Sequence, residues 1–253
     1  MTDRLEQQRA MVAEACRVAA ARGLVDGILG HISLSVDNET MLLRCRSDTD
    51  NGVAYTRPAD VRLVRFDGTA GAAGELDGYR VPNEFPIHAE TLLATHQHRA
   101  VAHLHPPQVV AADLAGITIR PIYGAYDIPG AWLARGGVPV YDRAVLIRSA
   151  ALGKELVAAM GNRPVVICRG HGIVSAAATV QQAVLQAISL DELARMSLRM
   201  LSAGGTLRDI DDTDWADLPD LGPSFTADAA WRHEIARLDE PVAGSPGYGA
   251  SPR

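Results

Sequence analysis

Two histidines interrupt an otherwise apolar stretch in the middle of the chain. His103 and His105 lie in the segment AVAHLHPP, residues 100–107. The segment has the length of a short buried strand, and its two prolines end that strand because proline has no backbone N–H for a ladder. Side chains two positions apart on a strand point to the same face of the sheet. A fold that uses this strand therefore places both imidazoles side by side.

A set of imidazoles of this kind can hold a divalent metal ion, since neutral imidazole is the commonest side-chain metal ligand. Taken alone, the pair also fits two histidines that only pack in a core. A third histidine, His171, lies between Gly170 and Gly172, and a carboxylate, Glu84, lies upstream. Glycines allow close backbone approach and unusual dihedral angles, which a core histidine rarely needs. Three histidines, a glutamate and an open position suit zinc, iron, manganese or cobalt, and indicate catalysis.

Length, charge and cysteine content narrow the class of protein. The chain has 253 residues, enough for one domain with a sizeable core, and its net charge of −6 gives no basic footprint for nucleic acid. No apolar run is long enough to span a bilayer, and residues 1–9 lack the apolar core of a signal peptide. Three widely spaced cysteines indicate reduced thiols. We therefore expect a cytoplasmic protein that binds neither nucleic acid nor a membrane.

Helix and strand patterns intermingle along the chain, with hairpin signals early. Helices are predicted at residues 2–22, 88–95, 107–114, 150–160 and 179–201, and strands at 32–36, 40–44, 61–66, 101–104, 117–123, 138–141, 165–168 and 172–175. This mixture favours an α/β layered domain over a strictly alternating parallel sheet. We place that domain at residues 1–205. Residues 206–253 are expected to form a partly irregular extension that packs on the same domain or on a neighbouring subunit.

Four segments resemble the class II aldolase/adducin superfamily, in the order and with the separations found there. They are GHIS at residues 30–33, NEFPIH at 83–88, AHLHPP at 102–107 and CRGHG at 168–172. Glu84 precedes His103 by 19 positions, and His105 and His171 follow. The resemblance extends to about residue 200, and the four segments together are far more specific than any one of them.

The resemblance implies a fold, a cofactor and an assembly. The fold is a mixed, mostly antiparallel central sheet flanked by helices, in a class II aldolase-like three-layer domain. One divalent metal ion per chain is held by His103, His105 and His171, with Glu84 as a further ligand or as the acid/base in turnover. Family members commonly form homotetramers whose active sites lie at subunit interfaces, and we expect the same here.

The chain departs from the sugar-phosphate aldolases of this family in the segments that hold the substrate phosphate. Those enzymes usually have Gly-Asn in the first motif and Ser-Ser before the glutamate. Here Gly30 is followed by His31, and Pro82 and Asn83 precede Glu84. His31 can still bind an anion, but several hydroxyl donors are missing. We therefore expect a small carboxylated substrate, aromatic or hydroxylated, in place of a sugar phosphate.

Other residues are assigned to the site by their position. Arg44 and Arg46 alternate on one face of a predicted strand end, and a guanidinium matches a carboxylate in a bidentate pair, although such arginines more often only lie on the surface. Tyr123 and Tyr126 lie where family aldolases have a catalytic tyrosine, but tyrosines are also common at interfaces. The predicted substrate-binding residues are His31, Ser33, Arg44, Arg46 and Asn83, and the predicted catalytic residues are Glu84, Tyr123 and Tyr126.

The leading hypothesis is a metal-dependent carbon–carbon lyase. A substrate that chelates the ion through adjacent oxygens would leave an enolate or dienolate, which a Lewis acid stabilises. Glu84 or a tyrosine near residue 123 would then protonate the carbanion. The altered phosphate segments favour decarboxylation of a hydroxylated aromatic acid of the dihydroxyphthalate type, in aromatic catabolism, over aldol cleavage of a non-phosphorylated hydroxy acid.

Two other functions stay open at this point. Some family-like proteins with the same Gly-His variant are iron oxygenases that act on hydroxyphenylpyruvate-type side chains, so a non-heme iron oxygenase keeps the metal and changes the chemistry. Adducin-type domains keep the fold, lose metal ligands and serve as binding modules. The intact Glu84 and its three histidines argue against a binding module, and oxygen dependence separates an oxygenase from a lyase.

Overall fold

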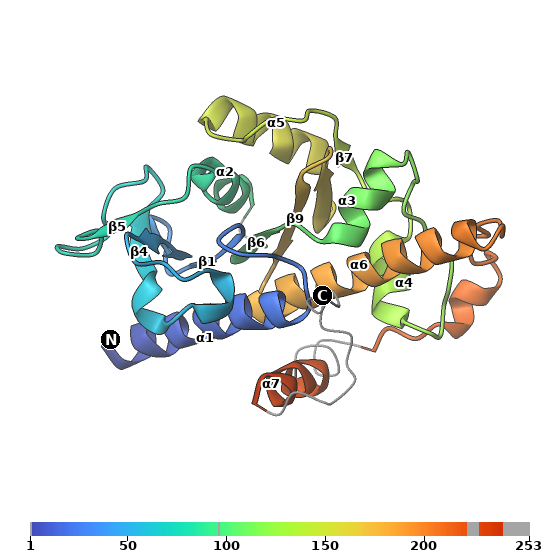
Figure 1. The fold of residues 1–253 in the computed structure, drawn as a ribbon, viewed down its shortest axis with the longest axis horizontal. Coiled ribbons are helices and arrows are strands. Elements are labelled where there is room, and N and C mark those ends of the chain that lie inside the picture. Colours follow the sequence, from blue (N-terminus) through green and yellow to red (C-terminus); the bar gives the residue numbers. More distant parts are fainter. Residues whose placement is uncertain (1, 96, 222–227, 240–253) are drawn as a thin grey trace, which may run out of the picture.

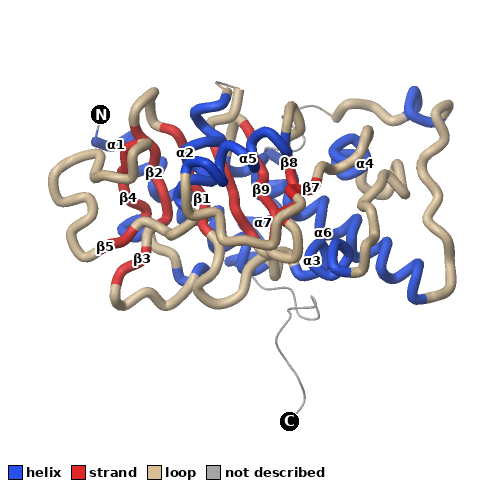
Figure 2. Tube along the Cα trace, turned by 90° about the horizontal axis from the view of Figure 1, so that it is seen from above, coloured by secondary structure: helices blue, strands red, loops and turns tan. Residues whose placement is uncertain are grey.

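A seven-stranded sheet runs through the protein in a computed structural model that describes residues 2–95, 97–221 and 228–239 (Figures 1 and 2). The strand order is β4–β2–β1–β6–β9–β8–β7. All neighbours are antiparallel except β7 and β8, which are parallel. The strands are β1 (His31–Ser35), β2 (Thr40–Arg44), β4 (Val61–Arg65), β6 (Ala100–Leu104), β7 (Val140–Tyr141), β8 (Val165–Cys168) and β9 (Gly172–Ala177). The mixed, mostly antiparallel sheet is thus confirmed.

Helices form a layer on each face of this sheet, as Figure 1 shows. One layer is α1 (Thr2–Ala21) and α6 (Val180–Ser202), and the other is α2 (Phe85–Ala94) and α5 (Ala150–Met160). α3 (Pro107–Leu114) and α4 (Ile128–Ala134) pack against α6, and α7 (Trp231–Asp239) packs against α1. A separate short ladder joins β3 (Arg46–Ser47) to β5 (Tyr79–Arg80), and 3₁₀ turns occupy Val53–Tyr55, Pro58–Asp60 and Asp214–Asp217. The predicted three-layer domain is confirmed.

The alternation of side chains along the central strands decides which residues can meet. On β6, Ala100, Ala102 and Leu104 enter the core under α1 and α6, and Val101 enters the core under α2 and α5. His103 shares a face with Val101, because side chains alternate along a strand. In β1, His31 pairs with His103 in register. The imidazoles of both strands are therefore directed toward the layer that contains α2.

One predicted strand is wrong. Residues 117–123 form no strand, although their apolar pattern is that of a buried segment and Ile119 is buried. The Ile117 N–H instead closes the end of α3 on the Ala112 carbonyl. Farther along, the Pro121 carbonyl accepts the Ile210 N–H. The segment is therefore buried by helix and loop contacts rather than by a neighbouring strand.

The extension after residue 205 contacts the rest of the protein at several places, Ile210 and Trp215 among them. Arg120 donates to the Leu207 carbonyl, and α7 packs against α1. Residues 240–253, where we expected the Pro-, Gly- and Ser-rich end, lie outside the described residues. The domain division at residue 205 stays a prediction. Among the described residues, every helix is too short or too polar to cross a membrane.

Candidate metal centre

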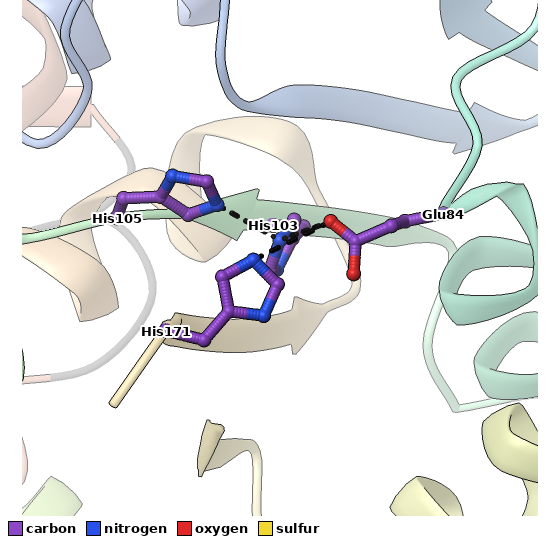
Figure 3. Close-up of side chains that lie close together, drawn as sticks. All are labelled: Glu84, His103, His105 and His171. Carbon is purple, nitrogen blue, oxygen red and sulfur yellow. Dashed lines mark hydrogen bonds and ion pairs between the residues drawn. The ribbon is translucent and has the colours of Figure 1, made fainter. Parts of the chain in front are cut away.

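Four side chains from separate parts of the chain converge beside the end of β6 (Figure 3). Glu84 immediately precedes α2, His103 lies on β6 and His105 follows it, and His171 lies in the turn between β8 and β9. One ligand atom from each lies within 4.8 Å of those of the others. The structure thus brings together the four residues predicted as ligands, and their binding of a metal stays a prediction.

The ring nitrogens and the carboxylate face one shared space. The Nε2 atoms of His103 and His171 lie 3.2 and 3.4 Å from Glu84 Oε2. His105 Nε2 lies 3.1 Å from His103 Nε2. Three imidazole nitrogens and one carboxylate oxygen are a common donor set for zinc and other divalent transition metals. The chemistry of these donors therefore fits a divalent ion.

A backbone contact fixes the orientation of His103. Its Nδ1 atom lies 2.9 Å from the Ile173 carbonyl oxygen of β9. A carbonyl can only accept, so Nδ1 donates and Nε2 is the atom that is left to face the cluster. A hydrogen bond from the second ring nitrogen is how proteins usually set the tautomer and direction of a metal-binding histidine.

Glu84 is anchored through one oxygen and faces the histidines with the other. Oε1 accepts the Ile147 N–H at 3.0 Å, and the side chain is buried. Burial alone would raise the pKa of Glu84, but the neighbouring imidazoles of His103 and His171 outweigh it, so the pKa is lowered. Glu84 is therefore an ionised carboxylate at neutral pH, which is the form that binds a cation.

The surroundings of His31, His88 and His105 hold these three imidazoles neutral. The pKa of His105 is lowered to about 3, mainly by burial and then by the neighbouring His103 and His171. Burial and His103 lower the pKa of His88 to about 3 as well. Burial, His88 and His103 lower the pKa of His31 well below its usual value. Neutral imidazole is the form that coordinates metals.

Glycines on either side of His171 allow the approach of the turn. Gly170 has a φ of 58°, and the His171 N–H donates to the Cys168 carbonyl at 3.0 Å. A Cβ atom at Gly172 would lie 2.3 Å from the Leu104 carbonyl oxygen and 2.7 Å from His105 Cδ2. Both properties expected of these glycines, an unusual dihedral angle and a close backbone approach, are confirmed.

A hydrogen-bonded set of three buried polar side chains, His31, Ser33 and His88, adjoins the cluster. His31 Nδ1 lies 2.6 Å from His88 Nε2, and His88 Nδ1 lies 2.7 Å from Ser33 Oγ. The His31 and His103 ring centroids are 5.1 Å apart. His88 on α2 is fully buried. His88 follows Glu84 by four positions, and residues four apart lie on the same face of a helix. This spacing is the sequence signal that could have placed His88 next to the cluster.

The two arginines predicted to bind substrate have other surroundings. Arg44 is only 2% exposed, and its Nη2 donates to both carboxylate oxygens of Asp50 at 2.8 Å. Its Nε donates to Thr56 Oγ1. These contacts make Arg44 a buried structural residue, and they do not support its role as a substrate ligand. Arg46 lies in the β3–β5 ladder, opposite Arg80.

The predicted tyrosines contact α6 rather than the cluster. The Tyr126 hydroxyl donates to Glu192 Oε1 at 3.2 Å, and the two tyrosine rings lie 5.1 Å apart. Burial, Asp127 and Glu192 raise the pKa of Tyr123. Within the described part of the chain, no hydrogen bond or ring contact joins either tyrosine to Glu84 or to its histidines. Asn83, by contrast, lies next to Glu84 and is exposed.

Comparison with known proteins gives a family match and close relatives. Residues 10–198 match the family described as class II aldolase and adducin N-terminal domain. A 3,4-dihydroxyphthalate decarboxylase from Rhodococcus jostii (strain RHA1) is 72% identical over 92% of this chain and 96% of its own length. A 3,4-dihydroxyphthalate decarboxylase from Terrabacter sp. (strain DBF63) is 58% identical over 91% of this chain and 97% of its own.

Solved structures of more distant proteins share the fold. An aldolase II superfamily protein from Pseudomonas syringae aligns with a TM-score of 0.76 at 22% identity, over 92% of each chain. An L-fuculose 1-phosphate aldolase from Glaciozyma antarctica PI12 aligns with a TM-score of 0.74 at 18% identity, over 92% of this chain and 90% of its own. At this identity the similarity concerns the fold.

Proposed function

Because the chain belongs to the class II aldolase and adducin family, we propose that it is a divalent-metal-dependent lyase that decarboxylates 3,4-dihydroxyphthalate in aromatic catabolism. The observation that carries this proposal is the convergence of Glu84 with His103, His105 and His171. It occurs in a chain that is similar over more than nine-tenths of its length to decarboxylases of that acid. The predicted resemblance to members that act on hydroxylated aromatic acids is confirmed by these relatives.

The reaction breaks the bond between a ring carbon and one carboxylate. Carbon dioxide leaves, the electron pair stays on the ring carbon, and a proton takes the place of the carboxylate to give a dihydroxybenzoate. A hydroxyl next to the departing carboxylate offers two neighbouring oxygens for chelation. Held by Glu84, His103, His105 and His171, a divalent ion would supply the positive charge that stabilises negative charge developing on those oxygens.

Glu84 is suited to hold or move a proton because its two oxygens have different partners. Oε1 is tied to the Ile147 N–H, and Oε2 faces the histidines. We assign Glu84 as a metal ligand at rest and as the group whose Oε2 can carry a proton to the ring carbon. Tyr126, which is 63% exposed, is proposed as the alternative proton donor, acting in the site of a neighbouring subunit. Tyr123 is proposed as a catalytic residue together with Tyr126.

His31 is the proposed contact for the substrate beside the cluster. Its Nδ1 is engaged by His88, so its Nε2 is left to bind a substrate oxygen. Ser33 is buried against His88 and acts on the substrate only through the orientation of that ring. Asn83, exposed next to Glu84, and Arg46 stay candidates for contacts with the second carboxylate.

The assembly and the ion complete the proposal. A small-molecule carboxylate is the substrate, and a homotetramer with active sites at subunit interfaces is proposed from the family. The ion is one of zinc, manganese, cobalt or iron, since all four accept this donor set. A cytoplasmic location stays a prediction from the reduced cysteines, which are all buried and free.

The test is turnover of 3,4-dihydroxyphthalate without oxygen. The protein, purified without chelators, is incubated with the acid under nitrogen, and carbon dioxide and dihydroxybenzoate are both quantified. We expect equal amounts of the two, loss of both after chelation, and recovery on addition of a divalent ion. Phthalate serves as the control substrate, because without hydroxyls it cannot form the hydroxyl–carboxylate chelate. A strict requirement for oxygen, or no carbon dioxide with any ion, would contradict the proposal.

A further inference from the structure

We propose that Asp113 on α3 is a positioning residue that holds the metal ligand His171 in place. It does so without contacting the imidazole, by binding the backbone of the turn from which His171 projects. The inference rests on the proposed metal site. It adds to that site a residue outside the four segments that carry the family resemblance.

The contact between Asp113 and the turn is short, and it joins an exposed turn to a buried acceptor side chain. Asp113 Oδ2 accepts the Gly170 N–H at 2.6 Å, and Gly170 is the residue directly before His171. The Asp113 side chain is only 6% exposed. Its other oxygen lies 3.9 Å from Nε of Arg169, which is also 3.0 Å from Asp142 on the protein surface. A hydrogen bond from an amide to a buried, charged acceptor is among the stronger ones in proteins.

The turn needs such a contact because glycine leaves it free to move. Gly170 has a φ of 58°, a conformation that glycine adopts easily but also leaves easily. The β8–β9 ladder pairs Cys168 with Gly172, so its pairing stops on either side of His171. The turn also packs directly on α3, since a Cβ at Gly170 would lie 3.2 Å from Leu114 Cδ2. Asp113 therefore fixes the backbone amide of the residue directly before the ligand.

The other end of α3 is fixed close to a second ligand. Asp191 on α6 accepts the backbone N–H groups of Gln108 and Val109, the first at 3.1 Å. Pro106, at the N-cap position, provides no side-chain cap, so Asp191 takes that role. α3 begins two residues after His105.

α3 thus connects the backbones that carry His105 and His171. Its first turn is held to α6 just after His105, and its last turn binds the amide next to His171. The ring centroids of these two histidines are 4.7 Å apart. Metal affinity depends on how closely ligands are held at their bound positions, and loss of an outer partner typically weakens binding by about 10- to 100-fold.

Three variants separate positioning from general stability. Asp113→Ala removes the acceptor for the Gly170 amide. Asp113→Asn keeps an oxygen that can accept from that amide and removes the charge. Asp142→Asn is the matched control, because Asp142 pairs with the side chain of the same Arg169 from an exposed position. Far-UV circular dichroism and thermal unfolding of the metal-free proteins check the fold of each.

The readout is metal binding without turnover. Zn²⁺ affinity is measured by competition with a chromophoric chelator, and the visible spectrum of bound Co²⁺ reports the ligand geometry. We expect Asp113→Ala to bind Zn²⁺ about 10- to 100-fold more weakly than the wild type, with an altered Co²⁺ spectrum. Asp113→Asn should recover most of the affinity and the wild-type spectrum, and Asp142→Asn should match the wild type.

Each other outcome has a definite meaning. Unchanged affinity and spectrum in Asp113→Ala, or an equal loss in Asp113→Asn, overturns the positioning role. If Asp113→Ala does not unfold cooperatively, Asp113→Ser replaces it, since the shorter hydroxyl cannot reach the Gly170 amide. If neither variant folds, Asp113 acts on the fold and the inference is overturned. If the wild type binds no metal, the proposed metal centre itself fails, which this series distinguishes from failure of the Asp113 inference.

Discussion

Gly172 lies at the start of β9, against the segment that carries His103 and His105. We predict that Gly172→Ala forces these segments apart, because the added Cβ would lie 2.3 Å from the Leu104 carbonyl oxygen. Overpacking of this kind typically costs roughly 1–3 kcal/mol of unfolding free energy. Since the same Cβ would lie 2.7 Å from His105 Cδ2, metal affinity should fall as well. Urea unfolding and chelator competition measure the two effects.

The matched control for that prediction is Gly161→Ala. Gly161 has a φ of 60°, and a Cβ there would contact nothing within 4 Å. With its ψ of −128°, this conformation strains a non-glycine residue by roughly 1–3 kcal/mol. Metal affinity should stay at the wild-type value, because Gly161 ends α5 and makes no contact with the ligands. A similar loss of metal affinity in both variants would count against a specific effect at His105.

Ser33→Ala tests the buried group beside the cluster. The change leaves Nδ1 of the fully buried His88 without its partner, and an unsatisfied buried polar atom costs roughly 1–3 kcal/mol. The KM for the substrate should also rise, because His88 holds His31. Ser35→Ala is the control on the same strand, since Ser35 Oγ donates to the Asp37 carbonyl in an exposed position. Urea unfolding and steady-state kinetics of both variants measure the two effects. Equal unfolding free energies and equal KM values in the two variants would contradict the role assigned to Ser33.

At the scale of residues, sequence reasoning found the groups that share a motif and missed those that meet only through folding. Glu84 and the three histidines stand in recognisable segments, and the structure brings them together. Asp113 belongs to no such segment, and its contact with Gly170 joins residues 57 positions apart. Arg44 is of the residue type expected to bind a substrate carboxylate, but its guanidinium already donates to the carboxylate of Asp50. Pairing of this kind depends on tertiary packing, which residue type alone does not reveal.

At the scale of elements, the cap that Asp191 provides to α3 makes stability depend on pH. Burial raises the pKa of Asp191 to about 6, although backbone N–H groups of α3 lower it in part. A raised pKa means that the folded protein binds the proton more tightly than the unfolded chain. The stabilising effect of that proton is therefore complete below about pH 4 and is lost as the pH rises through about 6.

Asp191→Asn should remove this dependence and keep an oxygen that can accept the Gln108 N–H. We predict that the unfolding free energy of the wild type, relative to the variant, falls by on the order of 2 kcal/mol between pH 4 and pH 7. Urea unfolding of both proteins at the two pH values measures the difference. The same difference at both pH values would show that Asp191 has an ordinary pKa.

The elements that sequence reasoning predicted well are those with local signals. A helix was predicted to begin at Thr179, and the Thr179 hydroxyl accepts the Gln182 N–H at 3.1 Å at the start of α6. Residues 117–123 were predicted as a strand because apolar residues recur there. Such a pattern indicates burial, but it does not say whether a strand with free hydrogen-bonding groups lies alongside, and here none does among the described residues.

At the scale of the whole molecule, the separation of the tyrosines from the cluster bears on assembly. Tyr126 is exposed and borders a cavity of about 830 Å³ beside α6, which Arg195 and Glu192 also line. We predict a homotetramer in which Tyr126 acts in the site of a neighbouring subunit. Tyr126→Phe should then lower kcat and leave the metal content unchanged. Light scattering coupled to size-exclusion chromatography measures the oligomeric state.

Subunit mixing tests this prediction directly. Tyr126→Phe supplies intact ligands, and the double variant His103→Ala with His105→Ala supplies an intact tyrosine. If the tyrosine acts across an interface, refolded mixtures of the two should regain decarboxylase activity that neither has alone. Mixtures that stay as inactive as their components, despite native mass spectra of mixed oligomers, would contradict a shared site.

The sequence allowed the fold class to be predicted, because the spaced motifs identify a family, and solved structures named as members of it share this fold. It did not determine the ion, since the same donors suit several metals. The division at residue 205 also stays open, since Arg120 binds the Leu207 carbonyl across it. The identity of the ion depends on the relative affinities of the site for different metals. The domain division depends on tertiary contacts between segments that are distant in the sequence.

The most direct test of the central claim is bound metal per chain together with decarboxylase activity. Wild type and the double variant His103→Ala with His105→Ala are purified without chelators and compared by elemental analysis and by anaerobic carbon dioxide release. His233→Ala, which changes an exposed histidine on α7, is the control. We predict nearly one divalent ion per chain and turnover in the wild type and in the control, with both lost in the double variant. Full activity in a metal-free wild type, or in the double variant, would contradict the account.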